Sequence, residues 1–251
     1  YIERVGGIGR ALTDKEYVSY YAKVPKQHFE VAFDYLSDIL FNPLLESDVI
    51  EKEKGIVMEE LRRGKDNPEV DIWDLWFKWI WGEDQSLGRP TLGDETTIRS
   101  ITKQKLQNYM DRFYHPSNMA IAVVGNFSLK KAEVYALKYF GRNQAKNIPT
   151  FKKLQFIPKK IHTKIIKADT EQAQLMLGFV TNISYHHKDR FTMRVIADIL
   201  SEGVSSRLFH KLVYELGIAY SAWAHTWIFA DTGLFYVLGG FAPENLEKAI
   251  K

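Results

Sequence analysis

The stretch EKEKGIVMEE, residues 51–60, decides the fold because it sets the buried side of a long helix that Ser47 is expected to cap. On a helical wheel at about 100° per residue, Glu53 and Glu60 fall within about 60° of the apolar Ile56. An amphipathic helix turns its apolar arc toward the core. The pattern therefore predicts that both carboxylates point inward.

Two inward glutamates need an explanation, because burying an unpaired ionised carboxylate costs several kcal/mol or more. In one interpretation the arc borders a cleft and both side chains reach water, or each meets a buried Arg or Lys. In the other, one carboxylate is a metal ligand and the second acid supports it. The helical pattern alone leaves both interpretations open.

Composition narrows the class of protein. The chain has 251 residues, of which 45% are hydrophobic and 26% charged, which is typical of globular proteins. The net charge of +3 comes from interleaved acids and bases, which argues against a nucleic-acid partner. The chain has no cysteine, so any metal must be held by His, Asp or Glu. No apolar run approaches the ~20 residues that span a bilayer.

Extended stretches alternate with amphipathic helices along the chain. Strands are predicted near 17–24, 119–124, 162–167 and 173–180, and helices near 187–201 and 205–216, followed by a hairpin that turns at 231–233. Further helices are predicted at 26–41, 47–64, 69–81 and 102–114. Strands joined by hairpins, with helices grouped between them, favour an α+β fold with antiparallel sheets.

A repeated pattern suggests two related halves. Pro25 and Pro243 each follow a strand and open a helix, and the lysine-rich, proline-bearing segment 147–160 separates the two occurrences. We therefore predict a first domain at 1–146, a linker at 147–160, and a second domain at 161–251. The lysines of the linker are interpreted as solvated rather than as a polyanion site.

Other candidate sites are weaker. His186 and His187 are adjacent and cannot share a helix face, so a solvated loop is favoured over a metal site. His210, close to Arg207 on its predicted helix, is interpreted as a surface histidine with catalysis as the alternative. The aromatic stripe at 73–81, WDLWFKWIW, is typical of a core or an interface. The sequence contains no phosphate loop, no G-x-S-x-G and no H-x-x-E-H.

Four blocks, in order, resemble the M16 family of zinc metallopeptidases, the inverzincins related to pitrilysin, insulin-degrading enzyme and the mitochondrial processing peptidase. The blocks are GGIGRALTDKEYVSYYAKVP, FNPLLESDVIEKEKGIVMEELRRGKDNP, SLGRPTLGDETTIRSIT with FYHPSNMAIAVVGNF, and LSEGVSSRLFHKLVYELGIAYSAWA. The resemblance implies two related α+β domains of the LuxS/MPP-like metallohydrolase type, both truncated.

The resemblance also implies a zinc site. The family binds Zn²⁺ through the two histidines of H-x-x-E-H and a glutamate roughly 75 residues downstream. Matched onto this sequence, that glutamate is Glu60, and Glu53 is the supporting acid. The histidines are expected roughly 15 residues before Tyr1, and the Glu between them would activate the zinc-bound water.

Substrate-binding residues follow from the same resemblance. Arg207 in SSRL and Tyr220 in GIAY match the Arg and Tyr that hold substrate near the scissile bond in the family. Arg10 and Ala11 stand where competent relatives usually have Asn-Ala, on the strand that pairs with substrate. The departure at Arg10 bears on substrate binding and on activity.

The implied function is a zinc endopeptidase that encloses peptides or small unfolded proteins between two M16 halves, with this fragment inactive alone. The alternative is a non-catalytic homologue that serves as a substrate-binding or scaffold subunit beside an active partner. The expected partners are a peptide substrate and either a second copy or another M16 subunit, with neither nucleic acid nor membrane. The sequence does not determine the compartment.

Overall fold

The computed structural model describes residues 1–251 except 142–145, 149, 156–162 and 169, together with the side chain of Tyr220. The chain forms two compact units. The first unit comprises residues 1–59 and 91–152, and the second comprises 60–90 and 153–251. The homologous domains predicted at 1–146 and 161–251 are a different division of the chain and stay a prediction.

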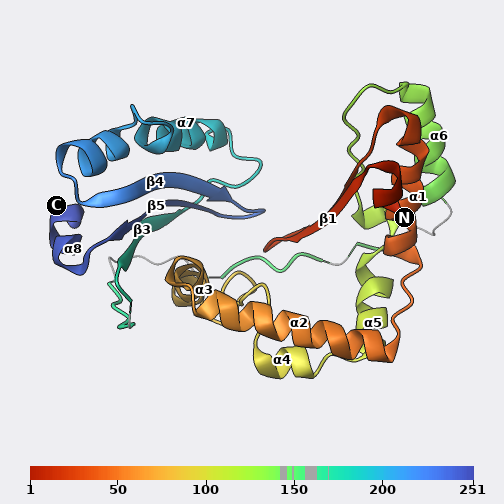
Figure 1. Cartoon of the computed structure of the whole chain (residues 1–251), viewed down its shortest axis with the longest axis horizontal. Helices are drawn as coiled ribbons and strands as arrows, with labels where there is room; N and C mark the ends of the chain where they lie inside the picture. The colour runs from red at the N-terminus through yellow and green to blue at the C-terminus, as the bar shows by residue number, and fades with distance from the viewer. Residues whose placement is uncertain (142–145, 149, 156–162, 169) are drawn as a thin grey trace. The chain divides into compact units, whose positions relative to one another are not determined.

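The first unit contains a two-stranded ribbon and several helices (Figure 1). β1 (Ile8–Thr13) and β2 (Val18–Lys23) pair antiparallel, with Arg10 opposite Tyr21. A 3₁₀ turn (Lys26–His28) leads into α1 (Phe29–Phe41), which packs on α6 (Leu129–Phe140). Aromatic rings fill the contact between the two helices: Phe29, Phe33, Phe41, Tyr135 and Phe140.

Local capping explains where several helices begin. Asn67 accepts a hydrogen bond from the amide of Glu69 (3.0 Å) at the start of α3 (Pro68–Trp81). Asp94 and Thr97 form a capping box on α4 (Glu95–Arg99). Thr102 caps α5 (Lys103–Phe113), which confirms the predicted start of that helix. α2 runs from Ser47 to Lys65.

The second unit is built on a sheet of order β3-β5-β4, in which both neighbouring pairs are antiparallel. The strands are β3 (Ala173–Thr181), β4 (Ala219–Ile228) and β5 (Gly233–Phe241). The predicted hairpin is confirmed, since the Phe229 amide donates to the Thr232 carbonyl (2.9 Å) between β4 and β5. β5 is central, and most of its side chains are buried.

α3 covers one face of this sheet. Trp76, Phe77 and Trp81 form a buried cluster with side chains that include Phe229 and Leu234. α7 (Arg190–Ser201) covers the other face, where Ala197 packs on Ala224 of β4 and Phe235 of β5 (Figure 1). A sheet that is apolar on both faces needs a layer on each, and α3 supplies one of them.

Two predicted strands are wrong for the residues that the structure describes. Residues 119–124 form no strand, and the Val124 side chain is 98% exposed. Residue 162 lies outside the described residues, and 163–167 form no strand. Both segments have a sequence typical of strands. A strand, however, requires a neighbouring strand with which to form hydrogen bonds, and the described structure places none beside them. None of the described helices is both long and apolar enough to span a bilayer.

Candidate metal and substrate site

The buried side of α2 includes only one edge of the predicted apolar arc. Ile50, Met58 and Leu61 are 9%, 8% and 8% exposed, so they form the stripe that faces the protein. Glu53 is exposed and Glu60 is half-buried, and Ile56 beside them is 53% exposed. The expectation that both carboxylates point into a core is therefore wrong, since Glu53 is exposed and Glu60 is partly exposed, and the metal role stays a prediction.

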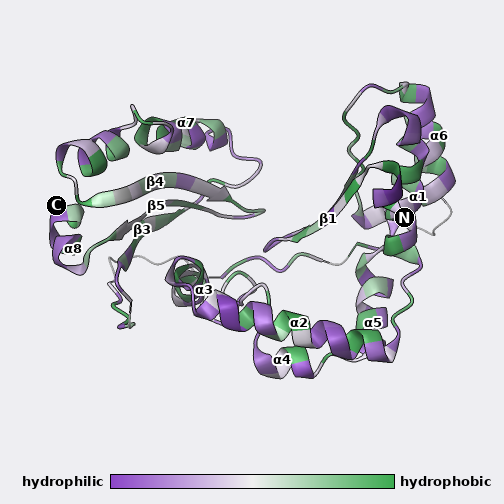
Figure 2. Ribbon diagram, in the orientation of Figure 1, coloured by the Kyte–Doolittle hydropathy of each residue, from purple (hydrophilic) through white to green (hydrophobic). Residues whose placement is uncertain are grey.

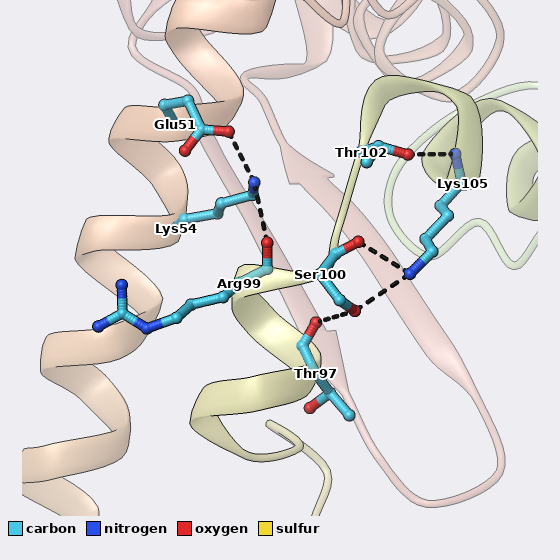
Figure 3. A network of polar contacts seen from close by, with 7 residues as sticks. All are labelled: Glu51, Lys54, Thr97, Arg99, Ser100, Thr102 and Lys105. Carbon is cyan, nitrogen blue, oxygen red and sulfur yellow. Dashed lines mark hydrogen bonds and ion pairs between the residues drawn. The ribbon is translucent and has the colours of Figure 1, made fainter.

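Lys54 shows how this side of α2 is held in the first unit. Its side chain is only 15% exposed, and its Nζ donates to the Glu51 carboxylate (2.6 Å) and to the Arg99 carbonyl (3.4 Å) (Figure 3). Beyond Arg99, Lys105 Nζ donates to the carbonyl (2.8 Å) and hydroxyl (3.1 Å) of Ser100. A lysine can cover apolar surface with its stem while its charged end stays paired. Because the Lys54 amine is paired, the side of α2 that carries Lys54 can be buried.

The exposed stripe of α2 mixes acidic and apolar side chains: Val49, Glu53, Ile56 and Glu60. Figure 2 shows α2 as largely hydrophilic, with hydrophobic residues interspersed along it. Glu53 and Glu60 are seven residues apart on one helix, which is about 10.5 Å along its axis. Side chains that meet on a helix are usually three or four residues apart, so two different roles along one face suit this separation better than joint ligation of one ion.

The described residues fit zinc in ligand type but not in number. Glu60 offers a partly accessible carboxylate, which is a suitable Zn²⁺ ligand. Across the described part of the chain, no group of three His, Cys, Asp or Glu could hold a metal ion. A catalytic zinc takes three protein ligands, so Glu60 alone does not make such a site.

Arg207 and Tyr220 both belong to the second unit. Arg207 is exposed and lies in the first turn of a helix, directly after the buried Ser206, whose carbonyl accepts from the His210 amide (2.9 Å). The backbone of Tyr220 lies in β4, at the irregularity in register between Ala219 and Ala222. Its side chain lies outside the described residues.

Arg10 and Ala11 are exposed on β1, opposite Tyr21 and Tyr20 of β2. Among the described ranges, β1 pairs with no strand other than β2, so its second edge carries unpaired backbone groups there. A cavity of about 370 Å³ adjoins this ribbon and contains neither Glu53 nor Glu60. Its lining is Gly6, Ile8, Lys23, Val24 and Pro25.

The predicted site residues are divided between the two units, with Arg10 and Glu53 in the first and Glu60 and Arg207 in the second. Within each unit, no hydrogen bond or ion pair between described residues links Glu53 to Arg10 or Glu60 to Arg207. Sequence reasoning also missed Glu215, which contacts His210 and Lys211 just after Arg207. The sequence offered no signal for this pair, because residues five apart do not meet on an α-helix.

Family models match nearly the whole chain. Residues 1–95 match the model described as Insulinase (Peptidase family M16), and residues 100–251 match the model described as Peptidase M16 inactive domain. The uncharacterized zinc protease YmxG of Bacillus subtilis is 35% identical over 98% of this chain and 59% of its own length. An uncharacterized zinc protease of Streptomyces coelicolor is 30% identical over 100% of this chain and 55% of its own length.

Solved structures agree on the fold. A protease from Helicobacter pylori superposes with a TM-score of 0.84 at 21% identity, over 99% of this chain and 62% of that one. The peptidase M16 inactive domain from Pseudomonas fluorescens superposes with a TM-score of 0.85 at 20% identity, over 99% of this chain and 61% of that one. The chain thus spans about three fifths of the length of these relatives. The predicted α+β fold is confirmed, and the chain belongs to the M16 (insulinase) family of zinc peptidases.

Proposed function

We propose that this chain is part of a zinc-dependent endopeptidase that cleaves peptides or small unfolded proteins in a chamber between two M16 halves. The observation that carries the proposal is 35% identity to a zinc protease over 98% of the chain. The position of Glu60 supports it, because a half-buried carboxylate on an exposed stripe can reach a metal from a fixed helix. A side chain on a long helix is held more rigidly than one on a loop.

In this proposal Glu60 is the carboxylate ligand of Zn²⁺, and two histidines outside the 251 residues complete the set. When bound, zinc would lower the pKa of a water and polarise the scissile carbonyl. Glu53, on the same stripe of α2, orients a ligand through hydrogen bonding rather than binding the ion itself.

Other residues bind the substrate in this proposal. β1 offers the edge beside Arg10 and Ala11, to which an extended peptide adds as another strand. Arg207 is exposed and donates a hydrogen bond to a carbonyl or carboxylate of the substrate. Tyr220 contacts the substrate near the scissile bond. A homodimer or a second M16 subunit would close the chamber.

A second function is favoured by one residue. Arg10 replaces the asparagine usual at this position of competent relatives, and its long cationic side chain changes what the strand edge accepts. A non-catalytic subunit that binds substrate beside an active partner would tolerate this change. Such a subunit would bind unfolded peptide without cleaving it.

Metal analysis of the full-length protein that contains this chain tests the ligand assignment. We expect Glu60→Gln to remove nearly all bound zinc and all peptide cleavage. Glu53→Gln should weaken zinc binding by about 10- to 100-fold. Glu59→Gln is the matched control, because Glu59 is an exposed neighbour outside the stripe, and it should retain zinc.

Unchanged zinc content in Glu60→Gln would refute the ligand role. Wild-type protein that binds an unfolded peptide but neither binds zinc nor cleaves would favour the scaffold function. The 251-residue chain alone should not cleave peptides. Zinc-dependent cleavage by that chain, purified free of other proteases, would overturn the assignment of ligands.

A further inference from the structure

The helix that follows Arg207 is not a regular α-helix. Residues Phe209–Glu215 form a π-helix, in which the Leu216 amide donates to the carbonyl of Lys211, five residues back (3.1 Å). Such turns are rare and are frequently found at functional sites. This one lies directly after the arginine that the proposed function places on the substrate.

The leucines of the segment pack together against the sheet. Leu208, Leu212 and Leu216 recur every four residues, and all three pack in the apolar cluster around Phe241. In an α-helix, every fourth residue is displaced by about 40°, so three leucines would spread over about 80°. A π turn displaces every fourth residue in the opposite sense, so this spacing does not by itself distinguish the two forms.

A polar clamp on the exposed side fits the same turn. The Glu215 carboxylate contacts His210 Nδ1 (3.2 Å) and Lys211 Nζ (2.6 Å). Residues five apart in an α-helix point about 140° away from each other, so the contact between His210 and Glu215 requires the π turn. The Lys211 contact has a four-residue spacing and fits either form.

We propose that Glu215 is a positioning residue for Arg207, acting through the His210 contact that selects the π turn. Leu212 is buried on the sheet below this turn. If this segment were a regular α-helix instead, the residues of the helix that precede the π turn would be rotated by about 100° around the helix axis. Arg207 would then point to a different side. The inference rests on the proposed function in one respect, the contact of Arg207 with substrate.

Through-hydrogen-bond NMR couplings on the isotopically labelled 251-residue chain test the clamp without reference to activity. In wild type, the Leu216 amide should couple to the Lys211 carbonyl. His210→Ala should shift the population toward coupling with the Leu212 carbonyl by roughly two- to fivefold, as expected for an exposed pair. Lys211→Ala should shift it less, because that contact does not distinguish the two turns.

Glu247→Ala is the matched control, since Glu247 makes an exposed pair with Lys251 (2.7 Å) in the same unit. It should leave the Leu216 coupling unchanged. Equal effects of His210→Ala and Lys211→Ala, or no effect of either, would overturn the clamp.

Peptide cleavage by the full-length protein tests the link to Arg207. Glu215→Ala should raise KM several-fold with little change in kcat, and the double variant with Arg207→Ala should be no worse than Arg207→Ala alone. Additive effects would refute positioning through Arg207. A wild-type protein that cleaves nothing would refute the proposed function, whereas the NMR result would stand or fall separately.

Discussion

The two units bury their strands to very different degrees. In the second unit, β5 is sandwiched between α3 and α7, and nearly every residue of the strand is buried. In the first unit, β1 has exposed side chains on both faces, with the sole exception of the half-buried Gly9. A two-stranded ribbon has too little apolar surface to form a layer of its own. Stability should therefore concentrate in the second unit.

Tryptophan makes this comparison measurable. All six tryptophans lie in the second unit: Trp73, Trp76, Trp79, Trp81, Trp223 and Trp227. Intrinsic fluorescence therefore reports unfolding of the second unit, and far-UV circular dichroism reports both units. Two transitions that do not coincide would show that the units unfold separately.

The largest effect is expected for Phe77→Ala. The Phe77 ring is 1% exposed and contacts Trp81, Trp227 and Phe229. Truncation should lower the free energy of unfolding by about 3–5 kcal/mol, as for other buried phenylalanines. Urea denaturation followed by tryptophan fluorescence measures it. Tyr21→Ala, at a ring 51% exposed on β2, is the control and should leave the fluorescence transition in place.

Gly178→Ala tests the contact between α3 and the sheet. A Cβ at Gly178 would lie 2.6 Å from the Phe235 carbonyl oxygen and 2.8 Å from Trp76 Cζ2. The backbone oxygen cannot move without distorting the strand pair, so we expect a loss of about 1–3 kcal/mol. Thermal unfolding followed by fluorescence should show a lower Tm. Wild-type stability would mean that β3 does not pack this closely against β5 and α3.

Gly55→Ala is expected to act in the opposite direction. Gly55 lies in the interior of α2, and a Cβ there would meet nothing within 4 Å. Alanine is favoured over glycine in an exposed helix by about 0.5–1 kcal/mol. We expect a higher Tm when thermal unfolding is monitored by circular dichroism. A loss would mean that this face of α2 is covered in solution.

Lys138→Met should have the smallest effect, and only away from acid. Lys138 Nζ contacts the Glu30 carboxylate, and this hydrogen bond holds the pKa of Glu30 below its usual value. A lowered pKa contributes stability above the ordinary carboxyl range, and the contribution is lost as pH falls through the lowered pKa.

The difference in Tm between Lys138→Met and wild type should therefore be present at pH 7 and vanish near pH 2. Circular dichroism at both pH values measures it, with Lys130→Met, an exposed lysine on the same helix, as the control. A difference that grows in acid would contradict this account of the pair.

Several elements were predictable because their signals are local. Thr102 begins α5, Asn42 ends α1, and the turn before Gly233 joins β4 to β5, each through contacts between near neighbours. The M16 family was also predictable, since its four sequence blocks keep their order. The metal role of Glu60 and the substrate role of Arg207 were predicted from that resemblance and stay predictions.

Other features depended on what packs against each segment. Residues 119–124 have the sequence of a strand yet form none, because strand formation requires a partner that sequence does not supply locally. The aromatic stripe of α3 was recognised as a core or interface, but the strands of its partner sheet lie between residues 173 and 241, far later in the chain. Contacts at that separation leave no local pattern.

The sequence by itself predicted one helix over 47–64, which the structure extends by one residue, and placed Glu53 and Glu60 on one side of it, since helical periodicity fixes which residues align. Only the tertiary structure decided which side is buried. Hydrophobicity ranked Ile56 above Lys54 for the interior, but Lys54 found acceptors at Glu51 and Arg99, and its side of the helix was buried instead. A charged group can be buried when its partners are in place, and one of these partners, the Arg99 carbonyl, lies 45 residues later in the chain.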